Sequence, residues 1–178
     1  MQTPSAYSCL VIPVPELEAV VRPRLERRSP ESLLPGRDDV HAHVTLLAPF
    51  AGEVDEGVSA ELASLFGDVT AFEFRLTRVA EFPGGATYLT PDPAAPFRAL
   101  TQELCRRFPE FPPYGGAFDE VVPHLTVPLR DGEDAAAVRR ELEPQLPITA
   151  HAREAALIWY EPGAFRVLER FAFGSAAA

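Results

Sequence analysis

Two short segments of this chain carry the same pair of chemically able residues. The first is His43-Val44-Thr45-Leu46, and the second, 81 residues later, is His124-Leu125-Thr126-Val127. In each, an imidazole and a hydroxyl stand two residues apart within an apolar run. A β-strand directs alternate side chains to opposite faces, so each His and Thr would share one face while their neighbours enter the core.

Two imidazoles on facing strands suit a reaction that removes one proton and supplies another, because the unperturbed histidine pKa is about 6.5. Phosphodiester transfer has both needs. One histidine would deprotonate the attacking water or hydroxyl, and the other would protonate the departing oxygen. The threonine hydroxyls would donate hydrogen bonds to the non-bridging phosphate oxygens. The scheme requires no metal.

Other residues near the motifs are weaker candidates for the same site. Arg130 follows the second motif at even spacing from His124 and would either supply positive charge or form a surface salt bridge. Tyr114 lies in the preceding loop, where its ring would cover a ligand. Aromatic side chains that either stack on a base or belong to the core complete the set: Tyr88, Phe118, Trp159 and Tyr160.

His41 shares the strand parity of His43 and leaves two alternatives open. It would reach the mouth of the cleft or be a solvated histidine before the strand. A third interpretation joins His41 and His43 to Asp38 or Asp39 as a metal site, but this ignores both threonines and the second motif. His151, between two alanines, is expected to be a surface residue.

Composition limits the classes of partner. The net charge of −10 repels a polyanion at long range, so we expect no binding of long nucleic acid, although a small anion in a locally positive pocket is compatible with it. We expect Cys9 and Cys105 to be buried, reduced thiols. The sequence shows no signal peptide and no membrane span, and we therefore expect a cytoplasmic protein. We also expect it to be a monomer.

The elements that would position the motifs occur twice. Apolar periodicity predicts strand, helix, His-Thr strand, helix and strand in each half, with a turn at residues 83–85 between the halves. Pro23 should kink or divide the first helix, and a closing hairpin is expected over 148–160 and 165–173. We expect one domain of two lobes, residues 1–84 and 85–178. The terminal segments could be exchanged between the lobes. The two His-Thr faces should line opposite walls of one cleft.

The twin motifs resemble the His-x-Thr-hydrophobic motifs of the two-histidine (2H) phosphoesterase superfamily, which includes the LigT-like 2′,5′-RNA ligases and cyclic phosphodiesterases. The resemblance covers nearly the whole chain. It implies an α+β fold, bilobal and duplicated, with antiparallel sheets around a central cleft. It also implies that His43 and His124 are the acid/base pair and that Thr45 and Thr126 bind phosphate.

The function implied is metal-independent hydrolysis of a 2′,3′-cyclic phosphate or a related small nucleotide or RNA terminus, with 2′,5′ joining of RNA in some relatives. No cofactor is implied. A non-catalytic module that binds nucleotides or RNA ends on the same fold is the alternative.

Overall fold

The computed structural model describes residues 6–36, 38–118, 121–161 and 165–174. Its described part forms one eight-stranded sheet with the order β6-β3-β4-β5-β2-β1-β7-β8, in which all neighbouring pairs are antiparallel. The strands are β1 (Tyr7–Pro13), β2 (His43–Leu47), β3 (Phe72–Glu81), β4 (Thr87–Asp92), β5 (Leu125–Thr126), β6 (Ile148–Ala152), β7 (Glu154–Tyr160) and β8 (Arg166–Ala172). The α-helices are α1 (Glu18–Arg28), α2 (Glu56–Gly67), α3 (Ala95–Arg107) and α4 (Ala135–Leu142), and the 3-10 turns are η1 (Pro15–Leu17), η2 (Pro30–Ser32), η3 (Pro113–Gly116) and η4 (Glu143–Gln145).

The order of elements confirms the predicted duplication. The series β1-α1-β2-α2-β3 is repeated as β4-α3-β5-α4-β6, and β7 and β8 follow. Strand pairing joins the two halves of the sequence, because β3 pairs with β4 and β7 pairs with β1. The motif strands β2 and β5 adjoin at the middle of the sheet. The fold is therefore the predicted α+β class, with an antiparallel sheet curled into a half-barrel.

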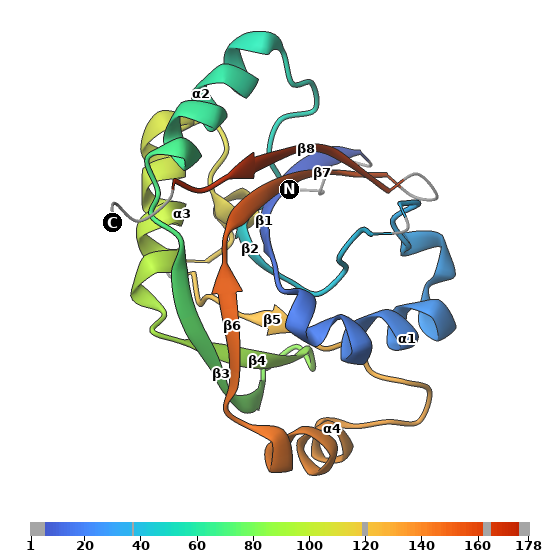
Figure 1. Cartoon of the computed structure of the whole chain (residues 1–178). Coiled ribbons are helices and arrows are strands. Elements are labelled where there is room, and N and C mark those ends of the chain that lie inside the picture. The colour runs from blue at the N-terminus through green and yellow to red at the C-terminus, as the bar shows by residue number, and fades with distance from the viewer. Residues whose placement is uncertain (1–5, 37, 119–120, 162–164, 175–178) are drawn as a thin grey trace.

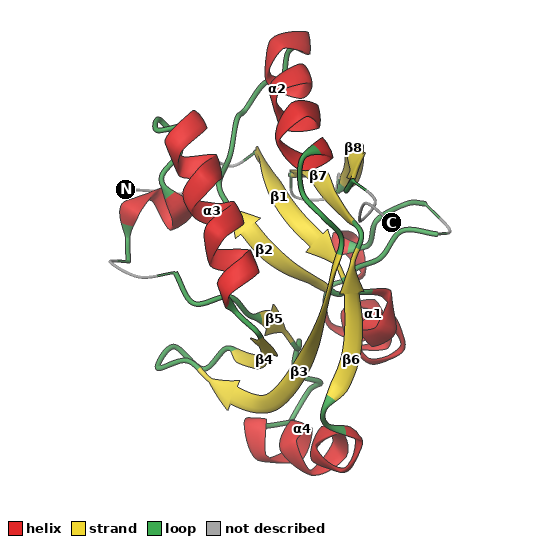
Figure 2. Ribbon diagram, turned by 60° about the vertical axis from the view of Figure 1, so that its left-hand side comes forward, coloured by secondary structure: helices red, strands yellow, loops and turns green. Residues whose placement is uncertain are grey.

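The sheet curves around an open side, and the helices occupy different sides of the curve. Figure 1 shows α2 and α3 outside the curled sheet and α1 at its opening, and Figure 2 shows α4 below the ends of β3 and β6. The apolar faces of the helices and the strand side chains that face them form one large core, in which Phe66, Phe74 and Phe97 are almost fully buried. Aspartate side chains cap α2 and α4: Asp55 accepts from the N–H of Val58, and Asp134 from that of Ala137.

Three details differ from the sequence prediction. The expected single strand over 148–160 is interrupted at Arg153, because β6 pairs with β3 at one end of the sheet and β7 pairs with β1 near the other. Of the two expectations for Pro23, division of the helix is ruled out, because α1 continues through it and buries Val21 and Arg24 on either side. The second motif strand contains only Leu125 and Thr126, so His124 directly precedes it. The expected hairpin of β7 and β8 is present.

No helix in the described ranges is long and apolar enough to cross a membrane.

Candidate active site

The two motifs meet on one face of the sheet. Val44 of β2 pairs with Leu125 of β5 in an antiparallel register, which sets His43 opposite Thr126 and Thr45 opposite His124. The alternation predicted from the sequence is present, because Val44 and Leu125 are fully buried while the four polar side chains are not.

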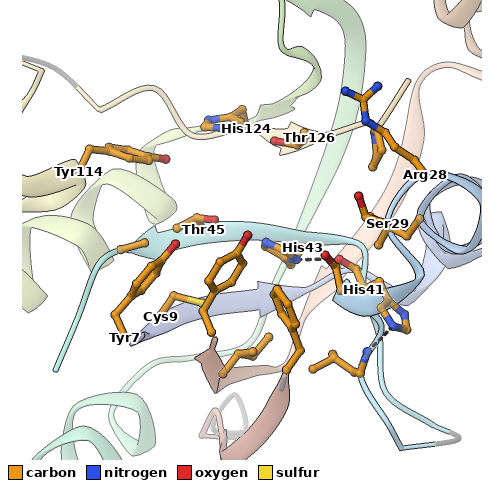
Figure 3. A pocket seen from close by; sticks show the side chains of 18 residues that line it. Tyr7, Cys9, Arg28, Ser29, His41, His43, Thr45, Tyr114, His124 and Thr126 are labelled. Atoms are coloured by element: carbon orange, nitrogen blue, oxygen red, sulfur yellow. Dashed lines mark hydrogen bonds between the residues drawn. The ribbon is translucent and has the colours of Figure 1, made fainter. Parts of the chain in front are cut away.

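This register corrects one expectation about the cleft. The two His-Thr faces do not form opposite walls, because neighbouring strands share one face of the sheet. The two histidines occupy diagonal positions, which in an antiparallel pair are about 7–8 Å apart. Figure 3 shows the arrangement, with His43 below Thr126 and Thr45 below His124.

All four motif side chains line one pocket of about 480 Å³, a size suited to a small organic ligand. Its other walls come from β1, β7, the C-terminal end of α1 and the loop before β5. The remaining described residues that line it are Tyr7, Cys9, Leu25, Arg28, Ser29, Ser32, Leu34, His41, Ala48, Tyr114, Pro128, Ile158, Tyr160 and Phe165.

Both motif histidines are oriented by the same local hydrogen bond. The Nδ1 of His43 lies 2.6 Å from the carbonyl oxygen of His41, and the Nδ1 of His124 lies 2.7 Å from that of Val122. A carbonyl only accepts, so each Nδ1 carries the proton and donates it. Each Nε2 is left as the nitrogen that can exchange a proton with a ligand, and among the described residues neither Nε2 has a hydrogen-bond partner.

Burial sets the charge of the two rings. Desolvation lowers the pKa of His43, the bond to the His41 carbonyl opposes this, and the nearby His124 lowers that pKa further. Burial also lowers the pKa of His124. Because a positive charge on one ring disfavours a second on the other, the pair would carry at most one positive charge at neutral pH.

Tyr114 borders the pocket from the loop before β5, as Figure 3 shows. It is the only described non-glycine residue with a positive φ, at 52°, a conformation that costs free energy. The loop holds it there, because the Tyr114 N–H donates to the carbonyl oxygen of Ala48 at 2.6 Å, just beyond β2. Burial raises the pKa of its hydroxyl, which therefore stays protonated and able to donate.

Arg130 lies outside the residues that line the pocket. Its guanidinium is 2.9 Å from Glu141, so of the two alternatives the structure shows the salt bridge. Arg28, which the sequence reasoning missed, is the one arginine among the described lining residues. Its Nη1 donates to the carbonyl oxygen of Leu129, close to the end of the second motif. The only sequence signal for it was its place in the last turn of α1, before the polar loop.

Of the four aromatic candidates, only Tyr160 lines the pocket. It stacks on Tyr7 with ring centroids 4.9 Å apart. Tyr88 is buried and packs edge-on against the His124 ring at 5.5 Å, so it supports the histidine from β4. Trp159 and Phe118 are not among the lining residues; Trp159 contacts Arg166, and Phe118 contacts Tyr114.

His41 is neither solvated nor available as a metal ligand. It is 5% exposed, its Nδ1 lies 2.6 Å from Glu18 Oε1, and its Nε2 accepts the N–H of Leu34. Asp39 is paired with Arg170 instead. Within the described ranges no group of three or more His, Cys, Asp or Glu side chains is placed to hold a metal ion.

The remaining predictions concern His151 and the two cysteines. His151 is at the surface as expected, 3.4 Å from Glu16. Both cysteines are free thiols; Cys9 is buried beside the pocket and Cys105 is partly buried. Burial raises the pKa of Cys9 to about 12, so its thiol stays protonated and is a poor nucleophile.

Comparison with known proteins agrees with this geometry. A sequence profile described as the 2′-5′ RNA ligase superfamily matches residues 13–164. The chain belongs to this superfamily. Membership confirms the resemblance drawn from the twin motifs and supports a catalytic enzyme of the phosphoesterase type.

Solved structures show the same fold. E. coli LigT complexed with 3′-AMP is 20% identical, with a TM-score of 0.56 over 94% of this chain and 98% of that one. E. coli LigT complexed with NADP+ is 22% identical, with a TM-score of 0.56 over 97% and 99%. The protein TT0787 of Thermus thermophilus is 18% identical, with a TM-score of 0.60 over 96% and 99%. No curated protein matches the chain.

Proposed function

We propose that this protein is a metal-independent phosphodiesterase that opens 2′,3′-cyclic phosphates of small nucleotides or RNA termini. One observation carries the proposal: both motif histidines donate from Nδ1 to a carbonyl two residues earlier, and both turn the other nitrogen toward one pocket. Such a pair can remove a proton from one oxygen and give a proton to another across a single phosphorus atom.

In the proposed reaction, the neutral histidine takes a proton through Nε2 from a water molecule as its oxygen attacks phosphorus. The bond from phosphorus to one ribose oxygen breaks, and the protonated histidine donates its Nε2 proton to that oxygen. The product is a ribose phosphomonoester with one free hydroxyl. The proton ends on the histidine that began neutral, so exchange with solvent restores the starting state.

The hydroxyls around the pocket would stabilise the phosphate during this step. Thr45 and Thr126 flank the diagonal between the histidines and would donate to the non-bridging oxygens, where charge accumulates. Tyr114 would donate a third hydrogen bond, and Arg28 would contribute positive charge at the end of the pocket. Arg28 thereby takes the role that the sequence offered to Arg130.

The substrate proposed is a small nucleotide or RNA end. E. coli LigT has been crystallised with 3′-AMP, NADP+ and ATP, which supports a small nucleotide as the ligand of this chain. The net charge of −10 disfavours long nucleic acid. With a 5′-hydroxyl in place of water, the same ring opening would join two RNA ends through a 2′,5′ linkage, and we include this ligation in the proposal.

The test is turnover of the four nucleoside 2′,3′-cyclic phosphates by the full chain in EDTA, followed by chromatography and ³¹P NMR. Linear 2′,5′ and 3′,5′ dinucleotides complete the panel. We expect hydrolysis of at least one cyclic phosphate at an undiminished rate in chelator. Binding without turnover would instead identify a nucleotide or RNA-end binding module, and activity lost in EDTA would overturn the metal-independent scheme.

A further inference from the structure

A partly buried carboxylate and a buried second histidine lie next to the segment that carries His43. Glu18 is the first residue of α1, and His41 precedes β2 by two residues. One oxygen of Glu18 lies 2.6 Å from His41 Nδ1, and the other accepts the backbone N–H groups of His41 at 2.7 Å and Ala42 at 3.0 Å. Three donors thus converge on one carboxylate.

The outer side of the His41 ring is also occupied. The backbone N–H of Leu34 donates to His41 Nε2 at 3.0 Å, so Nε2 is an acceptor and the proton resides on Nδ1, directed at Glu18. The side chain of His41 is only 2% exposed. Although it borders the pocket, both its nitrogens are used within the protein, so a ligand would not engage it by hydrogen bonding.

The same residue orients His43 through its backbone. The carbonyl oxygen of His41 accepts the Nδ1–H of His43 at 2.6 Å, while the N–H and side chain of His41 are held by Glu18. We propose that Glu18 and His41 are positioning residues that fix this carbonyl, and through it aim His43 Nε2 at the reacting phosphate. The proposal rests on the proposed function for the identity of the reaction.

The described residues give the second motif no equivalent support. The carbonyl that orients His124 belongs to Val122, which is 41% exposed, and among the described residues no carboxylate is bound to the peptide of Val122. The hydrogen bonds of Glu18 are therefore not part of the duplicated motif, and they act on His43 and not on His124.

The geometry requires a carboxylate at position 18. Glutamine offers one oxygen and one NH2 group, so it can accept either from the His41 ring or from the two backbone N–H groups, but not from both sides. Glu18→Gln should consequently loosen the His41 carbonyl while nearly conserving side-chain volume. It also removes a negative charge that opposes the lowering of the His43 pKa.

The first experiment compares Glu18→Gln with Glu16→Gln. Glu16 contacts His151 outside the pocket, so the control removes a Glu–His pair of the same chemistry a few residues away. We expect Glu18→Gln to lower kcat about 10-fold with KM changed less than about 3-fold, and to move one limb of the pH–rate profile to lower pH. Glu16→Gln should do neither. A folded Glu18→Gln protein with wild-type kcat and pH profile would overturn the proposal.

A second measurement uses the unmodified protein and needs no turnover. Side-chain ¹⁵N–¹H NMR reports the Nδ1–H protons of His43 and His124, assigned with His43→Gln and His124→Gln. Because the described contacts anchor the His43 acceptor and not the His124 acceptor, the Nδ1–H of His43 should exchange with solvent at least about 10-fold more slowly. Equal exchange would refute the positioning role, whereas inactivity toward every cyclic phosphate would refute the proposed function and leave this comparison intact.

Discussion

The two half-sites, one around His43 and one around His124, share the same local hydrogen bond and differ in the residues that support it. In both, the histidine donates to the carbonyl two residues earlier, so the motif itself sets the tautomer. His43 belongs to a five-residue strand flanked by β1 and β5, and a carboxylate anchors its acceptor carbonyl. His124 precedes a two-residue strand, and the rings of Phe82 and Tyr88 pack edge-on against it at 4.9 and 5.5 Å.

The difference shows that duplication preserved the part of the site that is local in sequence. The bond from Nδ1 to the preceding carbonyl needs only an extended backbone and is present in both copies. The outer support comes from unrelated elements, a helix N-terminus in one half and aromatic residues in and beside β3 and β4 in the other. Beyond that shared bond, the described support is a hydrogen-bonded carboxylate for His43 and the packing of aromatic rings for His124.

Helix α1 links the two half-sites. Its first residue, Glu18, anchors the segment before β2, and its last, Arg28, donates to Leu129 beyond β5. Between them, the fully buried Arg24 pairs with Glu141 of α4 at 2.8 Å and with Glu133 at 3.2 Å. One helix therefore connects both motifs and the helix of the second half, which helps to keep their spacing constant.

The largest expected effect tests whether the two halves are chemically equal. His43→Ala and His124→Ala should each lower kcat by about 10²-fold or more, because each removes one proton carrier from the same step. The double variant should lose far less than the product of the two losses. Steady-state kinetics on a cyclic phosphate measures this, with His151→Ala as the surface control. Full activity in either single variant would show that only one half-site is chemical.

The features of the site that depend on local sequence could be predicted from the sequence. Alternation placed His43 with Thr45 on one face of its strand and His124 with Thr126 on one face of the other, and the repeat of elements predicted the duplicated α+β fold. Both signals have short range, so they are readable without knowing which strands pair.

The features that sequence reasoning missed depend on long-range pairing. Nothing in the local sequence indicates that β3 pairs with β4 or that β7 pairs with β1. Nor does it indicate that Glu18 and His41, 23 residues apart in the chain, form a hydrogen bond. Its spacing from the motif left Arg130 as either a pocket cation or a partner in a salt bridge, and Glu133 and Glu141 engage it. Arg28 reaches the pocket only because α1 lies across the opening of the sheet.

The next effect concerns the hydroxyls that flank the histidines. Thr45 is half-buried and Thr126 is exposed, so a hydrogen bond from Thr45 to phosphate competes less with water. Thr45→Ala should lower kcat about 10²-fold and Thr126→Ala about 10-fold. Kinetics of both variants, with Thr→Ser at each position as the matched control, checks this order. A serine variant as impaired as alanine would mean that the methyl group, and not the hydroxyl, matters.

A smaller effect is expected for the cation at the end of α1. Arg28→Met should raise KM about 3-fold to 10-fold with little change in kcat, because an exposed guanidinium attracts the anionic substrate but is screened by solvent. Arg27→Met, which changes an exposed neighbour outside the pocket lining, is the control. Measuring KM at low and high salt completes the test, and the difference between Arg28→Met and wild type should shrink as salt rises.

The subtlest effect lies in the pH profile and compares the two imidazoles directly. The reaction needs one of them neutral and the other protonated, so kcat/KM should rise as the base loses its proton and fall as the acid loses its own. Burial lowers the pKa of both below the ordinary value of about 6.5, and their mutual repulsion separates the two macroscopic values. The maximum of kcat/KM should therefore lie below about pH 6.5. Bound phosphate is an anion that favours the protonated forms, so the kcat profile should be displaced to higher pH than that of kcat/KM. Rates from about pH 4 to 9 in one buffer series, taken for wild type and for each histidine variant, provide the measurement, and a maximum of kcat/KM at about pH 8 would mean that neither imidazole is the titrating group.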